Sequence, residues 1–206
     1  MNRLERILVI IPAYNEEDSI GRVIEDVRTN CPQMDILVVN DGSADHTSDR
    51  ARASGVVVLD LPFNLGIGGG MQTGYKYAAE KGYDIAIQVD GDGQHDPKEI
   101  PKLLQTLEER KVDVAIGSRF ITDLEYKATT MRRVGITVLS KVISIMVRQK
   151  ITDPTSGFRA SRQKAIQLFA VNYPQDYPEP EVVVLLSKSG LKKGGGSCKN
   201  EPEIFW

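Results

Sequence analysis

Apolar residues in the first half of the chain follow two alternating patterns. Short continuous apolar runs, such as residues 7–11, are typical of strands that are covered on both faces. Longer segments, such as residues 17–29, place apolar residues at every third or fourth position, as amphipathic helices do. The predicted strands are residues 7–11, 36–39, 56–59, 85–89 and 112–116, and the predicted helices are residues 17–29, 45–54, 66–82, 98–110 and about 181–190.

This alternation predicts an α/β fold with a mostly parallel sheet and helices on both faces. Pro12 is expected to end the first strand, because proline has no N–H for a sheet ladder. Right-handed crossovers would place the carboxyl ends of the strands along one edge, where ligands of such sheets bind. Polar segments follow four strands, at residues 12–16, 40–43, 64–66 and 90–96, so we expect them to converge on one cleft.

The composition is that of an ordinary globular protein and excludes several classes. The 206 residues carry a net charge of -2, which gives no general reason to expect nucleic-acid binding. Cys31 and Cys198 are too few for a disulfide framework or a four-cysteine zinc site, so we expect a cytoplasmic setting. The best candidate for a membrane span, Val134 to Val147, is interrupted by Lys141 and is shorter than the roughly 20 residues that a spanning helix needs.

An acidic cluster follows the strand at residues 85–89. Asp90 and Asp92 are two positions apart, a spacing that in extended backbone points both side chains to one side, and Gln94 continues this register. Two carboxylates and an amide oxygen suit Mg²⁺ or Mn²⁺, and Gly91 would let a ligand approach the backbone. The alternative is a turn rich in aspartate and glycine that only ends the strand.

Two other loops contain candidate binding or capping groups. A nucleobase could stack on Tyr14 and form a hydrogen bond with Asp41. Asp41 also fits a turn before a helix that is capped by Ser43 or Asp45. Asp96 is expected to cap the helix that begins at about residue 98.

A glycine-rich segment opens the third predicted helix. The backbone N–H groups of Gly66 and Gly68 suit phosphate binding at a helix start, whereas Gly69 and Gly70 fit close packing of the helix on the sheet. Arg119 follows the fifth predicted strand and is either a diphosphate ligand or a solvated surface residue.

Six motifs occur in order along the chain. They are Pro12-Ala13-Tyr14-Asn15-Glu16-Glu17, Asn40-Asp41-Gly42-Ser43, Asn64-Leu65-Gly66, Asp90-Gly91-Asp92-Gly93-Gln94-His95-Asp96-Pro97, Gly117-Ser118-Arg119 and Asp153-Pro154-Thr155-Ser156-Gly157-Phe158-Arg159. This series resembles the family 2 glycosyltransferases of GT-A fold, and in particular the branch of bacterial polyprenyl-phosphate glycosyltransferases and dolichol-phosphate mannose synthases. The resemblance covers residues 5–190.

The resemblance implies an inverting, metal-dependent transfer of a sugar from a UDP- or GDP-sugar to a polyprenyl phosphate. It implies one glycosyltransferase domain, residues 1–190, with a donor half over residues 5–120 and an acceptor half over residues 121–190. Asn40 departs from the family pattern, because many relatives have a second aspartate there. The expected donor-binding residues are Pro12, Tyr14, Glu16, Val39, Asp41, Gly66, Asp90, Gly91 and Arg119, the expected metal ligands are Asp90, Asp92 and Gln94, and the expected catalytic residues are Asp92, Asp153 and Arg119.

The acceptor side rests on a basic segment and on the last motif. Residues 127–150 contain six basic residues and no acidic ones, and their apolar spacing predicts a helix that lies on an anionic membrane surface or packs on the core. The resemblance favours the membrane surface. Asp153 would act as a base toward a sugar hydroxyl or orient a phosphate that needs no base, with Glu179 and Glu181 as alternatives. The expected acceptor contacts are Ser156, Arg159, Arg132 and Arg133.

Other functions stay open on the sequence alone. One alternative acceptor is a cell-surface polysaccharide or glycolipid that the enzyme would extend. Another reading is a protein that binds a nucleotide-sugar without catalysis. A homodimer and a peripheral position at the inner face of a membrane are also left open.

The tail, residues 191–206, does not resemble the end of a folded domain, since residues 194–200 read Gly-Gly-Gly-Ser-Cys-Lys-Asn. Shifted by one base, one back-translation of residues 195–200 reads Glu-Val-Pro-Val-Lys-Met, which suits a last strand. We predict a frameshift near residue 194 that removes this strand and part of the acceptor side. Sequencing the source gene should reveal the one-base change, and homologous genes that continue in the present frame to the same length would refute it.

Overall fold

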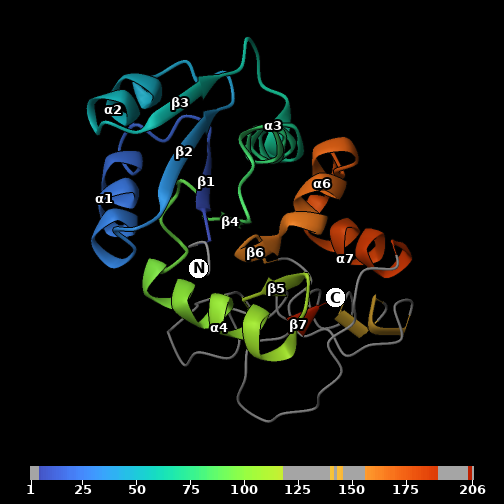
Figure 1. Cartoon of the computed structure of the whole chain (residues 1–206). Coiled ribbons are helices and arrows are strands. Elements are labelled where there is room, and N and C mark those ends of the chain that lie inside the picture. Colours follow the sequence, from blue (N-terminus) through green and yellow to red (C-terminus); the bar gives the residue numbers. More distant parts are fainter. Residues whose placement is uncertain (1–4, 118–139, 142, 146–155, 190–203, 206) are drawn as a thin grey trace.

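The computed structural model describes residues 5–117, 140–141, 143–145, 156–189 and 204–205. Within them, one sheet has the strand order β3-β2-β1-β4-β6-β5-β7 (Figure 1). The strands are β1 Ile7–Ala13, β2 Asp35–Asn40, β3 Val57–Asp60, β4 Ile85–Gln88, β5 Val114–Ile116, β6 Arg159–Arg162 and β7 Ile204–Phe205. The helices are α1 Ile20–Asn30, α2 Thr47–Ala53, α3 Gly66–Lys81, α4 Ile100–Arg110, α6 Gln163–Val171 and α7 Pro178–Lys188, with a 3₁₀ helix η1 at Pro97–Glu99.

The first four strands form the parallel part of the sheet. β1 lies between β2 and β4 and is parallel to both, and β3 extends this order beyond β2. β6 runs antiparallel between β4 and β5, and β7 pairs antiparallel with β5. The strands and helices predicted for residues 7–116 and the helix predicted at about 181–190 are present, so the α/β prediction is confirmed. β6, α6 and β7 were not predicted.

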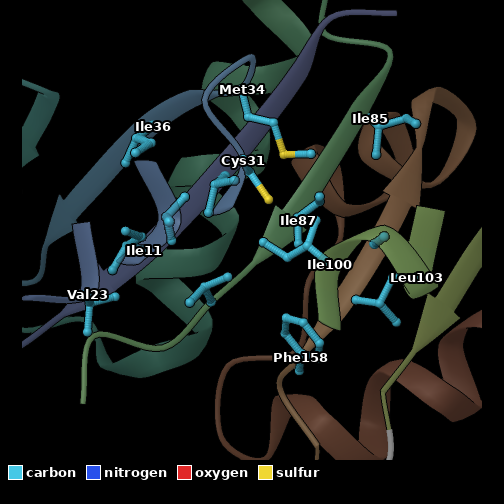
Figure 2. Close-up of a cluster of buried hydrophobic side chains, with 14 of the residues drawn as sticks. Ile11, Val23, Cys31, Met34, Ile36, Ile85, Ile87, Ile100, Leu103 and Phe158 are labelled. Atoms are coloured by element: carbon cyan, nitrogen blue, oxygen red, sulfur yellow. The ribbon is translucent and has the colours of Figure 1, made fainter. Parts of the chain in front are cut away.

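Helices cover both faces of the sheet, as the apolar patterns predict. Side chains alternate along β1, where Leu8 and Ile10 join a core with α3, α6 and α7, and Val9 and Ile11 join a core with α1 and α4. Figure 2 shows the second core, which brings together side chains of α1, β1, β4 and α4. Each large aliphatic side chain buried in this way contributes about 1.5–3 kcal/mol to folding. The two cores therefore fix the position of the strand ends.

Pro12 does not end the first strand, contrary to the prediction, because β1 continues to Ala13. The register explains why proline is tolerated there. The last pair between β1 and β4 joins Ile10 to Gln88, so Pro12 lies beyond the β4 ladder and its missing N–H removes no ladder hydrogen bond. Its carbonyl oxygen accepts a hydrogen bond from Gly91 N at 3.3 Å.

Glycines let α3 approach its neighbours closely. A Cβ atom on Gly74 would collide with Cγ2 of Ile10 in β1. A Cβ atom on Gly68 would collide with the carbonyl oxygen of Pro174, which follows α6. Gly68 therefore has a packing role, and phosphate binding by its backbone N–H stays a prediction.

One prediction for the C-terminal part needs correction. The tail was expected to lack a strand, but β7 lies within it and pairs with the edge of β5. Of residues 127–150, the structure describes 140–141 and 143–145, where Ile143 is buried in the core and Ile145 is 78% exposed. No helix in the described part of the chain is long and apolar enough to cross a membrane.

Replacing Gly74 by alanine should lower the free energy of unfolding by about 1–3 kcal/mol, because the added methyl group overpacks against Ile10. Gly21→Ala in α1 is the matched control, since a Cβ there meets no atom within 4 Å. The better helix propensity of alanine should leave that variant unchanged or more stable by about 0.5–1 kcal/mol. Urea unfolding followed by circular dichroism measures both, and equal midpoints would contradict the close approach of α3 to β1.

Candidate functional site

The loops that follow the parallel strands meet at one edge of the sheet. Asp41 N, after β2, donates to Ala13 O at 2.9 Å, and Gly91 N, after β4, donates to Pro12 O at 3.3 Å. Leu61 N, just after β3, donates to the last carbonyl oxygen of β2 at 2.9 Å. Because these backbone hydrogen bonds join adjacent loops, the predicted convergence of the polar segments is confirmed.

Side chains lock the loop after β1 to the loop after β2. Asn15 N donates to Ser43 Oγ at 2.9 Å, and Ala44 N donates to Asn15 Oδ1 at 2.9 Å. Glu16 N donates to Thr47 Oγ1 at 2.8 Å. Asn15 has a φ of 55°, a left-handed conformation in which asparagine is enriched. The two loops therefore form one unit with a defined backbone.

The predicted donor-binding residues of these loops differ in exposure. Tyr14 is 49% exposed, so its ring offers a free face. Glu16 is half-buried, and its carboxylate accepts a hydrogen bond from the hydroxyl that precedes α1. Asp41 is buried, and its Oδ1 accepts from Leu65 N at 2.7 Å. Val39 lies in the core. The two carboxylates thus hold the loops in place, and the tyrosine is the group that is presented to solvent.

Capping groups mark the starts of the helices beside these loops. Asp45 Oδ1 accepts a hydrogen bond from Thr47 N at 3.0 Å at the start of α2. Asp96 Oδ1 accepts from Lys98 N at 3.0 Å in η1. The predicted cap at Asp96 is confirmed. The predicted N-cap of α2 at Ser43 or Asp45 is wrong, because His46 occupies that position, and Ser43 connects the two loops instead.

Asn40, the departure from the family pattern, ends β2 beside an acidic residue. Its Nδ2 donates to Asp60 Oδ1 at 2.9 Å, and Asp60 also binds Arg52 and Ser48. The hydrogen bond from Arg52, with those from Ser48 and Asn40, outweighs the effect of burial and lowers the pKa of Asp60 to about 2. An aspartate at position 40 would face this carboxylate, so asparagine removes a contact between like charges.

The two glycines predicted to bind phosphate have different surroundings. Gly66 begins α3 with a φ of +77°, and a Cβ there would meet no atom within 4 Å. Its N–H donates to Asn64 Oδ1 at 2.8 Å. Gly68 and Gly69 are closed by packing, and Gly70 is buried within α3. Gly66 is therefore the open position at the start of this helix.

The chain does not stay extended through the acidic cluster, contrary to the prediction. β4 ends at Gln88, Gly91 and Asp92 form a turn, and Gly93 has a φ of +77°. Asp92 is exposed, with Oδ1 accepting from Gln94 N at 2.9 Å and Oδ2 accepting from Gln94 Nε2 at 2.8 Å. Glycines on both sides favour a turn over a strand. The turn, and not a shared strand register, therefore brings Asp92 and Gln94 together.

Asp90 lies two residues after the last residue of β4, with its side chain 32% exposed. Gln88 Nε2 donates to Asp90 Oδ1 at 3.0 Å, and Asp90 N donates to His95 Nδ1 at 3.0 Å. A Cβ on Gly157 would lie 3.1 and 3.3 Å from the two carboxylate oxygens. Within the described residues no three acidic, histidine or cysteine side chains form a metal cage. A cation at this edge would therefore need Asp90 and Asp92 together with oxygens of the substrate.

The segment before β6 reaches the same edge, but its polar side chains are buried. Arg159 lies opposite Gln88 in the sheet and is fully buried. Its Nη2 donates to Ser156 O at 3.2 Å, and its Nε donates to Gly157 O at 3.3 Å. Ser156 is also buried, and its Oγ has no partner in the described chain. Their burial does not support the predicted contact of Ser156 and Arg159 with an acceptor phosphate.

Several predicted residues lie outside the described ranges, and their assignments remain predictions. They are Arg119, Arg132, Arg133 and Asp153, together with most of residues 127–150. Glu179 and Glu181 lie in the first turn of α7, as expected of residues that begin a helix. Glu179 is half-buried and Glu181 is exposed.

The family model described as Glycosyl transferase family 2 matches residues 8–169. The chain belongs to this family. It is 37% identical over 175 residues to the undecaprenyl-phosphate mannosyltransferase of Micrococcus luteus, covering 81% of this chain and 71% of the relative. It is 32% identical over 208 residues to the UDP-N-acetylglucosamine–dolichyl-phosphate N-acetylglucosaminyltransferase of Methanococcus voltae, covering 91% and 82%.

Solved structures show the same fold. Glucosyl-3-phosphoglycerate synthase from Mycobacterium tuberculosis, crystallised with Mn²⁺, UDP and glucosyl-3-phosphoglycerate, matches with a TM-score of 0.64 at 23% identity. The match covers 88% of this family 2 glycosyltransferase, which spans 64% of the length of that chain. The predicted GT-A fold is confirmed.

Three residues beside the acidic cluster of this glycosyltransferase were not singled out from the sequence. They are Gln88, His95 and Gly157. Gln88 does carry a signal, because it is a polar residue inside an otherwise apolar strand. His95 and Gly157 lie within motifs, but their contacts with Asp90 depend on the turn after β4 and on the position of β6.

Asp60→Asn in this glycosyltransferase should flatten the pH dependence of stability in acid. The folded pKa of about 2 lies below the usual 3.8, so the stabilisation is present above pH 3.8 and is lost as the pH falls through about 2. Because the side chain is 40% exposed, we expect only about 1 kcal/mol. Urea unfolding should show the wild type to be more stable than the variant near neutral pH, with the difference vanishing near pH 2. A difference that does not change with pH would contradict this ionic contribution.

Proposed function

We propose that this chain is an inverting, metal-dependent glycosyltransferase that moves a hexose from a nucleotide-sugar to a polyprenyl phosphate. The observation that carries the proposal is the position of Asp90 and Asp92 beside the joined loops at the carboxyl edge of the parallel strands. Open parallel sheets bind nucleotides at this edge. Two relatives are named for undecaprenyl and dolichyl phosphate, which supports the same class of acceptor.

The donor atoms at this edge fit Mg²⁺ or Mn²⁺. Each oxygen of Asp92 accepts one hydrogen bond and keeps a lone pair, and Asp90 presents a partly exposed carboxylate. Gln94 turns its amide nitrogen to Asp92, so its oxygen is left for a cation. We assign the cation to these three residues. When bound, it would neutralise charge on the departing nucleoside diphosphate. Mn²⁺ and UDP in a solved neighbour agree with this choice.

The nucleotide would occupy the joined loops after β1 and β2. The exposed ring of Tyr14 offers a stacking surface for a base. Asp41 and Glu16 would keep that surface in place through the loops that they hold. A Cβ on Gly91 would lie 3.0 Å from Pro12 O, so glycine lets the loop after β4 approach the loop after β1 closely.

The acceptor is assigned as an anionic nucleophile. A polyprenyl phosphate needs no residue to remove a proton, since its oxygen is already charged at neutral pH. Inversion follows if this oxygen attacks the anomeric carbon opposite the leaving diphosphate in one displacement. We assign Arg119, Arg132 and Arg133 to the phosphates and Asp153 to orienting the acceptor. A peripheral membrane contact through residues 127–150 would deliver the lipid chain.

Incubation with UDP- and GDP-hexoses, Mn²⁺ and a short polyprenyl phosphate tests the function. One donor should give a polyprenyl-phosphate hexose of inverted anomeric configuration, detected by NMR, and chelation of the metal should abolish it. Transfer only to glycan acceptors would establish an enzyme that extends a polysaccharide or glycolipid. Donor binding without transfer to any acceptor would establish a binding protein.

Asp92→Ala should weaken Mn²⁺-dependent donor binding at least tenfold, or by about 1.4 kcal/mol, because one carboxylate ligand of the cation is removed. Asp96→Ala is the matched control in the same loop, since Asp96 caps η1 and faces Lys98 N. It should cost about 1 kcal/mol of stability and change donor affinity less than twofold. Isothermal titration with and without Mn²⁺ measures both effects. Unchanged affinity and metal dependence in Asp92→Ala would refute the metal assignment.

A further inference from the structure

The first carboxylate of the acidic cluster is held more tightly than the second. Asp90 Oδ1 accepts a hydrogen bond from Gln88 Nε2 at 3.0 Å, and Asp90 Oδ2 lies 3.5 Å from His95 Nε2. Gly157 closes the space beside both oxygens. Asp92 is exposed and is bonded within its own turn. The orientation of the Asp90 carboxylate is therefore more restricted than that of Asp92 before a ligand binds.

His95 contacts Asp90 at both ring nitrogens. Because Asp90 N donates to Nδ1 at 3.0 Å, the neutral ring carries its proton on Nε2, and this proton is on the nitrogen nearest the carboxylate. The side chain of His95 is only 4% exposed. Its ring packs on Phe158, with 5.2 Å between the centroids, and Phe158 belongs to the core in Figure 2. The core thus fixes the direction of the Nε2–H group.

Glutamine at position 88 would be energetically unfavourable if its side chain served only to fill space in the core. It is the last residue of β4 and is buried, and its Oε1 has no hydrogen-bond partner in the described chain. A buried polar atom without a partner costs about 1–3 kcal/mol. An apolar residue, as at Ile85 and Ile87 in the same strand, would avoid that cost. The amide is therefore best explained by the hydrogen bond that it donates to Asp90.

We propose that His95 and Gln88 are positioning residues of sugar transfer and act through Asp90. Their N–H groups set the rotation of the carboxylate, so that its remaining lone pairs are directed to the cation. This inference rests on the proposed function, in which Asp90 binds a divalent cation. Mutation of residues that form hydrogen bonds with a metal ligand typically lowers metal affinity by about 10–100-fold.

Substitutions of His95 separate positioning from packing. His95→Gln keeps a donor near the position of Nε2, whereas His95→Phe keeps a ring against Phe158 and removes both nitrogens. Positioning predicts that His95→Gln retains more Mn²⁺ affinity than His95→Phe, with a loss of about tenfold or more for phenylalanine. Packing alone predicts the reverse order.

Gln88→Met provides an independent variant, because it keeps the volume and removes the amide. It should lose about tenfold in Mn²⁺ affinity while keeping its stability, since the unpartnered Oε1 is removed with the donor. The matched control is Gln105→Met. The side chain of Gln105 is exposed and lies on α4, outside the proposed site, so this variant should stay within twofold of the wild type.

Mn²⁺ affinity is measured from the free-ion signal in electron paramagnetic resonance, with UDP and with GDP, beside urea unfolding of each variant. Asp90→Asn gives the background from nucleotide-bound Mn²⁺. Wild-type affinity in folded His95→Phe and Gln88→Met would overturn the positioning role and leave the proposed function intact. No Mn²⁺ binding above background by the wild type would instead reject the proposed function itself. If His95→Phe does not fold, Gln88→Met decides the question.

Discussion

The pairing of β1 with β4 is the contact on which the site depends. The chain builds β1, β2 and β3 outward in one direction, and then returns through α3 to place β4 on the other side of β1. Parallel sheets bind ligands where the strand order reverses in this way. Here the reversal joins Pro12 O to Gly91 N, and Asp90 directly precedes that junction. Residues 79 positions apart are thereby placed at one point. Closing a loop of this length costs conformational entropy, which the packing of the two cores offsets.

β6 completes this edge because it runs antiparallel to β4. The first residues of β6, and not its last, therefore lie beside the end of β4, with Arg159 opposite Gln88. This direction places Gly157 against the Asp90 carboxylate and Phe158 against His95. A parallel strand at the same place would carry residues 156–159 to the opposite edge of the sheet. β6, the antiparallel neighbour of β4, thus supplies residues that pack against the acidic cluster.

The parallel part of the fold was predictable because strands buried on both faces are continuous apolar runs. β6 has no such run, since it reads Arg-Ala-Ser-Arg, and its pairing is decided by contacts with β4 and β5. The location of the site at the ends of the strands could be predicted from the sequence. The hydrogen-bond partners of its residues could not. Asp41 was expected to face a base, and it binds Leu65 N; the acidic cluster was expected to be extended, and glycines turn it. Local periodicity indicates which residues share an edge, whereas hydrogen-bond partners depend on loops that have no periodicity.

Arg159 shows what this arrangement requires energetically. Its fully buried guanidinium forms no ion pair with the described residues, and desolvation of such a cation costs several kcal/mol. Two carbonyl hydrogen bonds, each worth about 1.5–3 kcal/mol, offset part of that cost. Burial lowers the pKa of Arg159, and the Tyr173 and Tyr75 hydroxyls with the Glu179 and Asp90 carboxylates raise it above its usual value. The cation is therefore retained, and the charge of Asp90 supplies part of its compensation. A residue whose motif suggested an acceptor phosphate instead lies buried beside the end of β4, where its guanidinium is held by the carbonyl groups of its own segment.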